Sequence, residues 1–486
     1  MPRRCLALGL CALALNACGD PPVVLDAYTP PDAEWVSSDR ARLRDDTGRV
    51  VILRGVNARV DGVFDVTFDD GRVPLETIPS FDATDAVRMR ELGLSVLRLP
   101  INWSAIEPVE GTYDEAYLDR VSAIVSACRD ARVHVIVDFH QDGYSKEIGE
   151  DGAPLWAIHP PPDMLLEGPL GGSLSERIVS EQVQRAYTSF FVDDDADTED
   201  VRLQAAFAAM ARHVATRFAD EPFVLGYDLY NEPIVADRYL EGFHDRVAAA
   251  IREVDERHLL LFEPSATRNF TERAPLSRVP FADDGGVYAV HLYTFAFTDS
   301  AAELAMLTRA DLEPNVLNAV REAERWDVPL LVGEWGIGPD APNSDLYVRI
   351  MYELFDEHLA SSAVWLWKEE SQGRWGFFDG DTDGDWTERP AVVAAHGRVY
   401  AERIAGEPTS MRYDADTRVF ELSYEGRSDL APHVIYVPVT YPAAFSVTCD
   451  GAAITPTPAR DAATGRVEVV CAGPGARVVR LTPDEG

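Results

Sequence analysis

Eight short, apolar, β-rich segments recur along the chain, and segments with a helical hydrophobic period separate most of them. The expected strands span residues 50–57, 95–100, 133–140, 223–233, 258–264, 287–293, 329–336 and 362–368. Their interiors are continuously apolar, which is typical of a parallel sheet covered on both faces. This alternation favours an α/β fold, a closed (β/α)8 TIM barrel. An open, doubly wound sheet is the alternative, but no glycine-rich phosphate loop follows any expected strand.

The expected barrel spans residues 35–405, and the pattern changes after it. Residues 406–486 carry short alternating β runs that Gly, Pro, Asp and Ser separate, with no helical period. This pattern predicts a small C-terminal all-β sandwich, which could bind carbohydrate or serve as a structural appendage. Cys449 and Cys471 lie in this segment, and they could form a disulfide in an exported protein.

Residues 1–18 have the pattern of an export signal, in which two arginines precede an apolar run too short to span a bilayer. The run ends in Leu-Asn-Ala-Cys, which resembles the lipobox of bacterial lipoproteins and implies a lipid anchor on Cys18. A plain secretory signal cut after Ala17 is the alternative. Residues 19–34 form a proline-rich linker. We therefore expect an exported protein that is either anchored in the bacterial cell envelope or secreted.

The net charge of −38 argues against nucleic acid as a partner, because its phosphates would repel such a surface. No His or Cys cluster has zinc spacing, and we expect neither a metal nor a cofactor in the chemistry. The loop from Asp379 to Asp385 resembles the start of a calcium loop, but Pro390 stands where the final glutamate is expected. A solvated acidic turn is therefore favoured there over bound calcium.

Polar, acidic and aromatic residues follow the ends of the expected strands in the same register. The carboxyl ends of barrel strands meet on one face, where catalytic residues lie in this fold. We therefore expect these side chains to converge at the barrel mouth. They are Asn57, Arg98, His140, Asn231, Glu232, Glu263, His291, Tyr293, Glu334, Trp335 and Trp367.

Two of these residues suggest a reaction. Glu232, in Asn-Glu-Pro, ends the fourth expected strand, and Glu334, in Gly-Glu-Trp-Gly, ends the seventh. Strands four and seven lie across the barrel mouth, so the two carboxyls can face each other over a substrate. Glycoside hydrolysis needs such a pair, because one carboxyl protonates the leaving oxygen while the other attacks the sugar or activates water. Two unrelated surface acids are the alternative.

These two motifs resemble those of glycoside hydrolase family 5, whose members are retaining (β/α)8 enzymes. The resemblance implies that Glu232 is the general acid/base and Glu334 the nucleophile. It also implies that Arg98 keeps Glu334 ionised. The further implied substrate-binding residues are Asn231 for the hydroxyl beside the anomeric carbon, His140 and His291 for the glycone subsite, Tyr293 for the nucleophile, and Trp367 as a stacking floor.

The His-Gln-Asp triplet at 140–142 and the Gly-Ala-Pro-x-Trp motif at 152–156 are similar to those of endoglycoceramidases within this family. Those enzymes cut the bond between a glycan and ceramide. The resemblance implies that Asp142 and Trp156 hold the first sugar. The insertion from about 141 to 200 has an apolar, proline-rich part that suits a glycolipid. We expect a retaining β-glycosidase acting on glycosphingolipids; the alternatives are an endo-β-glucanase or mannanase, a steryl-glucosidase, and a non-catalytic glycan-binding lipoprotein.

Overall fold

The computed structural model describes residues 35–192, 199–271, 283–296, 300–369, 375–380, 385–427, 432–456, 460–471 and 473–484. The predicted signal, Cys18 and the linker therefore lie outside the described residues, as do residues 381–384 of the expected acidic turn. Residues 33–486 group into one compact unit. Within the described ranges, no helix combines the length and the apolar character that crossing a membrane requires.

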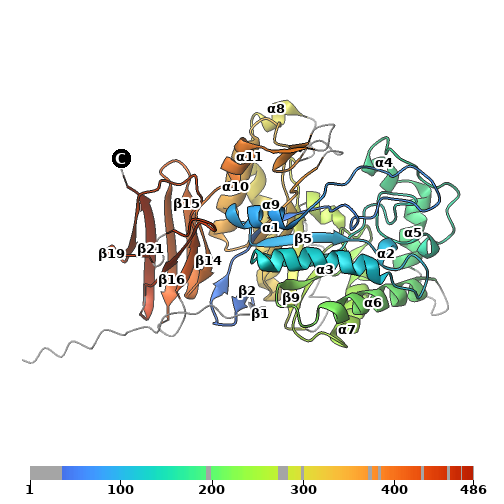
Figure 1. Cartoon of the computed structure of the whole chain (residues 1–486), viewed down its shortest axis with the longest axis horizontal. Coiled ribbons are helices and arrows are strands. Elements are labelled where there is room, and N and C mark those ends of the chain that lie inside the picture. Colours follow the sequence, from blue (N-terminus) through green and yellow to red (C-terminus); the bar gives the residue numbers. More distant parts are fainter. Residues whose placement is uncertain are drawn as a thin grey trace, which may run out of the picture. The chain divides into compact units, whose positions relative to one another are not determined.

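Eight parallel strands close into a barrel, with neighbours in the order β10-β11-β4-β5-β6-β7-β8-β9. Figure 1 labels two of these strands, β5 and β9. The strands are β4 (Arg54–Asn57), β5 (Val96–Ile101), β6 (His134–Phe139), β7 (Val224–Asp228), β8 (Leu259–Phe262), β9 (Gly286–Leu292), β10 (Leu330–Trp335) and β11 (Ser361–Val364). The predicted TIM barrel is confirmed, and the open doubly wound sheet is wrong. Closure follows from pairing between β10 and β11 and between β11 and β4.

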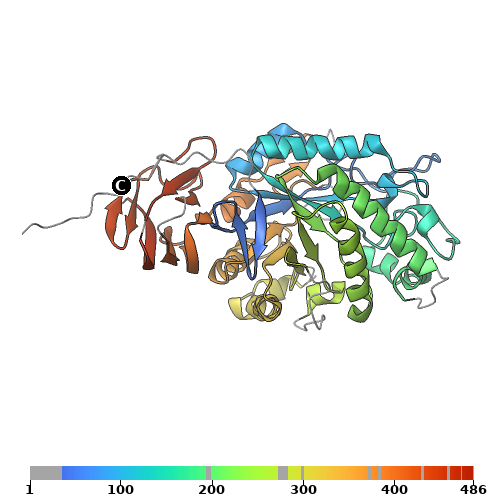
Figure 2. The same cartoon turned by 90° about the horizontal axis from the view of Figure 1, so that it is seen from below.

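Helices surround the strands, and Figure 2 shows the green helices α6 and α7 side by side on the outside of the barrel. The helices are α1 (Ala83–Glu91), α2 (Trp103–Ile106), α3 (Glu115–Asp130), α6 (Glu199–Phe218), α7 (Asp237–Arg252), α8 (Ala301–Leu304), α9 (Arg309–Trp326), α10 (Ser344–Glu357) and α11 (Pro390–His396). Their starts follow from local sequence: Asp82 caps α1 in a capping box, and Asp114 accepts a bond from the Tyr117 N–H at the start of α3.

The buried apolar residues of the insertion after β6 join the main hydrophobic core of the barrel. It contains η1 (Leu155–Ala157), α4 (Leu174–Ile178) and α5 (Glu181–Phe191). Phe190 of α5 packs edge-on against Trp103 at a ring distance of 6.2 Å. Tyr187 donates to Gln141 Oε1 at 2.5 Å, and Gln141 donates to the Asn231 carbonyl at 2.7 Å. The insertion thereby fixes the backbone that carries the Asn-Glu-Pro motif.

Two antiparallel sheets share a second hydrophobic core and form the predicted all-β region. One sheet contains β1 (Val36–Asp39), β2 (Arg42–Asp45), β3 (Val50–Val51), β14 (Tyr400–Ile404), β17 (His433–Tyr436) and β20 (Arg466–Val469). The other contains β15 (Gly406–Asp414), β16 (Val419–Gly426), β21 (Gly475–Pro483), β18 (Phe445–Cys449) and β19 (Ala452–Ile454). The first sheet takes strands from both sides of the predicted boundary at 405, which stays a prediction.

The expected disulfide joins Cys449 to Cys471, and their Cα atoms are 5.5 Å apart. A separate two-stranded sheet, β12 (Phe378–Gly380) with β13 (Trp386–Glu388), follows the last barrel strand. The Trp386–Glu388 strand leads into α11, which covers the outside of the barrel near α10.

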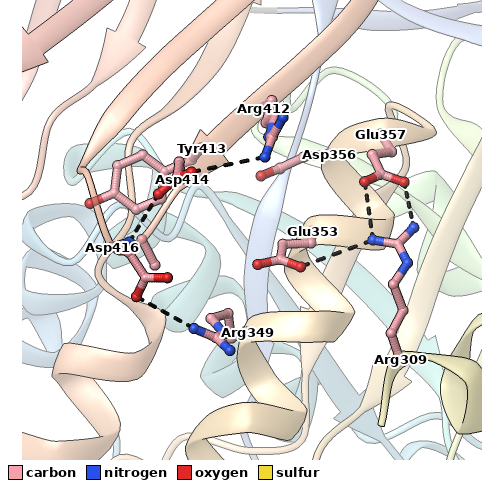
Figure 3. Close-up of a pocket in the computed structure, with 10 residues that line it drawn as sticks. Arg309, Arg349, Glu353, Asp356, Glu357, Arg412, Tyr413, Asp414 and Asp416 are labelled. Carbon is pink, nitrogen blue, oxygen red and sulfur yellow. Dashed lines mark hydrogen bonds and ion pairs between the residues drawn. The ribbon is translucent and has the colours of Figure 1, made fainter.

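A charged cavity of about 260 Å³ lies between α10 and β15 (Figure 3). Its arginines all face acids: Arg309 lies 2.5 Å from Glu357, and Arg349 lies 3.7 Å from Asp416. None of the strand-end residues of the barrel lines this cavity. It is therefore separate from the cluster described next.

Candidate active site

Arg98 of β5 lies at the centre of the polar cluster at the barrel mouth, and its side chain is fully buried. Its guanidinium donates to Asn57 Oδ1 at 3.1 Å, Asp228 Oδ2 at 3.0 Å, Asn231 Oδ1 at 2.9 Å, Glu263 Oε1 at 3.1 Å and Glu334 Oε1 at 2.6 Å. Burial alone would lower the pKa of Arg98, but the surrounding carboxylates raise it well above its ordinary value. Arg98 is therefore a fixed positive charge against Glu334.

Glu334 reaches the cluster from β10 through an irregular strand register. The pairing of β10 with β9 shifts between Val332 and Glu334, so Gly333 forms a bulge that redirects the next side chain. A Cβ on Gly333 would lie 2.9 Å from His291 Nε2, so the close approach requires glycine. Tyr293 donates its hydroxyl to Glu334 Oε2 at 2.8 Å. Burial raises the pKa of Glu334, and the charges of His291 and Arg98 act in the opposite direction.

Glu232 follows β7 with a backbone φ of +41°, a left-handed value that is uncommon for a residue with a side chain. Its N–H donates to Glu263 Oε2 at 3.0 Å, which holds this turn in place. Its Oε1 accepts from Asn269 Nδ2 at 2.7 Å and from His291 Nδ1 at 2.8 Å. The Glu232 side chain is 21% exposed, whereas that of Glu334 is 6% exposed. The two carboxyls thus occupy different environments.

The closest approach of these two carboxylates is short. One oxygen of Glu232, one oxygen of Glu334 and one nitrogen of His291 all lie within 4.8 Å of one another. Retaining enzymes place their two carboxyls about 5–5.5 Å apart, whereas inverting enzymes need roughly 6.5–9.5 Å to admit a water molecule. The limit of 4.8 Å between the closest oxygens is compatible with the retaining arrangement, in which one carboxylate attacks the sugar directly.

Both predicted histidines are buried beside carboxylates. Burial would lower the pKa of His291, but Glu263, Glu334 and Glu232 raise it well above its ordinary value. His140 has its Nδ1 2.6 Å from Asp138 Oδ2, and its pKa is raised in the same way. The neighbouring carboxylates therefore favour the charged form of both imidazoles, which offsets the acidic charge of the cluster.

The structure places the predicted residue Asp142 at the edge of this cluster. Its Oδ2 lies 3.6 Å from His140 Nε2, and its side chain is 21% exposed. Burial beside other acids raises the pKa of Asp142. The expectation that Asp142 holds the first sugar stays a prediction.

Trp156 is not brought together with the catalytic pair. Its indole N–H donates to the Glu107 carbonyl at 2.9 Å, and its ring packs edge-on against Trp103 at 5.2 Å. These contacts tie the insertion to the α2 segment that follows β5. The expectation that Trp156 holds the first sugar stays a prediction.

Trp367 cannot serve as the stacking floor that the family resemblance implied. Its side chain is 1% exposed, and its indole N–H donates to Asp85 Oδ1 at 2.8 Å. The alternation of strand side chains does not extend to this residue, because β11 ends at Val364. Trp365 is the half-buried tryptophan at the mouth, and its ring stacks on that of His140 at 5.9 Å and 12°.

Three polar residues of the site were absent from the predicted set. Asp138 and Asp228 are acids inside otherwise apolar strands, and both face Arg98 at 3.0 Å. A carboxylate within a continuously apolar strand was the available signal for them. Asn269 lies in η2 (Ala266–Phe270), a short 3₁₀ helix that no sequence pattern marks.

A cavity of about 400 Å³ adjoins the mouth, and Trp365 forms part of its wall. Its apolar lining residues include Ile337, Val348, Leu366, Phe377 and Val392. Arg389 and Glu388 contribute polar groups to the same lining. Trp365 thus lies against His140 of the polar cluster and also forms part of the lining of this cavity.

Comparisons with known proteins agree with this geometry. A family model described as cellulase (glycosyl hydrolase family 5) matches residues 76–371, and a model of the glycoside hydrolase family 5 C-terminal domain matches residues 398–480. Endoglycoceramidase I from Rhodococcus hoagii is 27% identical, over 92% of this chain and 86% of its own length. An endoglycoceramidase from Cyanea nozakii is 25% identical, over 72% of this chain and 74% of its own length. The structure of endo-glycoceramidase II from Rhodococcus sp. as a lactosyl-enzyme intermediate covers 91% of this chain and 99% of its own, with 26% identity and a TM-score of 0.76.

Proposed function

The chain belongs to glycoside hydrolase family 5, and we propose that it is a retaining β-glycosidase that cuts the bond between the glycan and the lipid of glycosphingolipids. The observation that carries this proposal is the carboxylate pair, in which oxygens of Glu232 and Glu334 lie within 4.8 Å of each other. Both acids are present, so a non-catalytic glycan-binding role is not favoured.

In the first step, a carboxylate oxygen of Glu334 attacks the anomeric carbon while the bond from that carbon to the lipid oxygen breaks. Glu232 donates its proton to the departing oxygen, so the lipid leaves as a neutral alcohol. The glycan is then held to Glu334 as an ester. Arg98 and Tyr293 each bond one oxygen of Glu334, which orients the carboxylate and favours its charged form before attack.

In the second step, Glu232 acts as a base. It takes a proton from a water molecule, whose oxygen attacks the anomeric carbon as the ester bond to Glu334 breaks. This returns Glu334 to its ionised form and Glu232 to its protonated form, and the free glycan keeps its original anomeric configuration. The greater exposure of the Glu232 side chain, 21% against 6% for Glu334, suits a residue that must meet both the leaving group and water.

Two observations support a glycolipid as the substrate. The relatives over most of the chain's length carry the name endoglycoceramidase, and one related structure is described as a complex with ganglioside GM3. In this chain, the cavity beside Trp365 presents apolar side chains next to the polar cluster. We therefore propose that the sugars occupy the polar cluster and that part of the lipid occupies the apolar cavity.

The test is product analysis with the chain from residue 21 onward. We expect a ganglioside to yield free ceramide and one intact oligosaccharide by mass spectrometry, and Glu334→Gln to yield neither. Cleavage of a soluble β-glucan or mannan without ceramide release would assign the chain to polysaccharides. Cleavage of a steryl glucoside alone would assign it to the steryl-glucosidase alternative.

We further propose that the protein is exported and anchored through lipid on Cys18. The signal-like residues 1–18 and the disulfide between Cys449 and Cys471 support export, because disulfides persist in oxidising compartments. Expression in bacteria with labelled palmitate should label the full chain. A Cys18→Ala variant that takes up as much label as the wild type would contradict the anchor.

A further inference from the structure

Asn269 bonds the same oxygen of Glu232 as His291 does. Its amide nitrogen lies 2.7 Å from Glu232 Oε1, and the Asn269 side chain is 1% exposed. His291 Nδ1 donates to that oxygen at 2.8 Å. Oε1 of Glu232 therefore has two donors directed at it, while no such donor contacts Oε2 among the described residues.

We propose that Asn269 is a positioning residue for proton transfer by Glu232. An oxygen that accepts from two N–H groups is poorly placed to carry a proton of its own, so the transferable proton resides on Oε2. Asn269 also fixes the carboxyl plane through Oε1, which directs Oε2 toward the glycosidic oxygen. This inference rests on the proposed role of Glu232 as the general acid/base.

Buried contacts hold η2 and thus Asn269 in place. The neighbouring residue, Arg268, is fully buried and donates through Nε to the two oxygens of Glu322 on α9, at 3.0 and 3.2 Å. Arg268 also donates to Asn315 of α9. Tyr288 of β9 donates to Glu322 Oε2 at 2.6 Å, which ties the ion pair to the barrel wall. These contacts hold the short 3₁₀ helix η2 against α9 and β9.

The backbone of Asn269 is also tied to the residue that bonds the nucleophile. The Tyr293 N–H donates to the Asn269 carbonyl at 3.1 Å, while the Tyr293 hydroxyl donates to Glu334. This backbone hydrogen bond thus links Asn269, which contacts Glu232, to Tyr293, which contacts Glu334. Because reaction geometry must be correct within a fraction of an ångström, such a connection matters for the relative placement of the two carboxyls.

The test compares two aryl β-lactosides that differ in their need for an acid. Dinitrophenolate is a weak base and departs without being protonated. Methylumbelliferonate is a stronger base, so its departure depends more on a proton from the enzyme. Loss of proper acid catalysis should lower kcat/KM for the methylumbelliferyl substrate in Asn269→Ala and Asn269→Asp by about tenfold or more, within the range that acid–base catalysis supplies. The dinitrophenyl substrate should be cleaved nearly as well as by the wild type. Thr267→Ala, an exposed change on the same η2 segment, should leave both rates unchanged.

Equal rate losses for both substrates, or no loss for either, would overturn the proposal. A folding defect or a purely structural role of Asn269 would lower the rates without regard to the leaving group. A wild-type enzyme that cleaves neither lactoside would instead count against the proposed function. The two failures are therefore distinguishable. Matching melting temperatures for Asn269→Asp and the wild type would exclude unfolding as the cause of a selective loss.

Discussion

Removing the Tyr293 hydroxyl should show how much its hydrogen bond to Glu334 contributes to catalysis, while Glu334 stays buried. In the wild type, Arg98 bonds Glu334 Oε1 at 2.6 Å and Tyr293 bonds Oε2 at 2.8 Å. Tyr293→Phe removes the second donor and leaves Arg98 in place. The Tyr293 side chain is 5% exposed, so water has little access to the vacated position.

The size of the effect follows from the bond that is lost. A hydrogen bond to a charged group contributes about 1.5–3 kcal/mol. Since each 1.36 kcal/mol is a tenfold change in rate, kcat/KM should fall roughly 10- to 150-fold. The loss should appear in kcat as well as in kcat/KM, because Tyr293 contacts the nucleophile.

The pH profile should change in a defined direction. Attack requires ionised Glu334, so activity is lost as pH falls through the pKa of that carboxyl. Burial already raises this pKa, and removing a donor to the charged form raises it further. The acidic limb of kcat/KM should therefore move to higher pH in Tyr293→Phe.

Tyr347→Phe is the matched control. Tyr347 is also fully buried, and within the described part of the chain its hydroxyl has no hydrogen-bond partner. This variant should keep the wild-type rate and pH profile. If Tyr293→Phe instead keeps the wild-type kcat and acidic limb, or changes KM alone, the hydroxyl does not act on the nucleophile.

Three further changes test other parts of the account. Ala391→Trp narrows the apolar cavity, so it should slow cleavage of a ganglioside more than that of an aryl lactoside, whereas Ala394→Trp, exposed on the same helix and outside the cavity lining, should slow neither. Trp365→Ala should raise KM for both kinds of substrate, because its ring lies against His140 at the mouth and forms part of the cavity wall, and a wild-type KM would contradict a contact between Trp365 and the substrate. Replacing Cys449 and Cys471 by serine should cost about 3 kcal/mol of stability for a crosslink spanning 22 residues, measured by denaturant unfolding; unchanged stability would contradict this estimate.

The barrel was predictable because its signals are local. Each strand is a short apolar run, each helix has its own period, and the order of elements selects the topology. The pairing of β1–β3 with β14 was not predictable, since it joins residue 51 to residue 403 and leaves no local pattern. Long-range pairing of very short strands has no periodicity that one sequence can reveal.

The site residues also differ in whether a local sequence pattern marks them. Arg98 and Glu334 lie on the barrel strands β5 and β10, and Glu232 follows β7, so their position along the chain predicts their position at the mouth. Trp367 was wrong because the strand ends before it, and side-chain alternation then carries no information. Asn269 was missed because the short 3₁₀ helix η2 has no sequence signature, and its place beside Glu232 depends on Arg268 and α9 rather than on a motif.

The central claim is that Glu334 forms a covalent bond to the glycan while Glu232 transfers the proton. The most direct measurement uses a dinitrophenyl lactoside carrying fluorine on the carbon beside the anomeric centre, which slows the second step more than the first. We expect the protein mass to increase by one fluorolactosyl group, and peptide sequencing to place that group on Glu334. A label on another residue, or turnover with inverted configuration and no covalent adduct, would contradict the account.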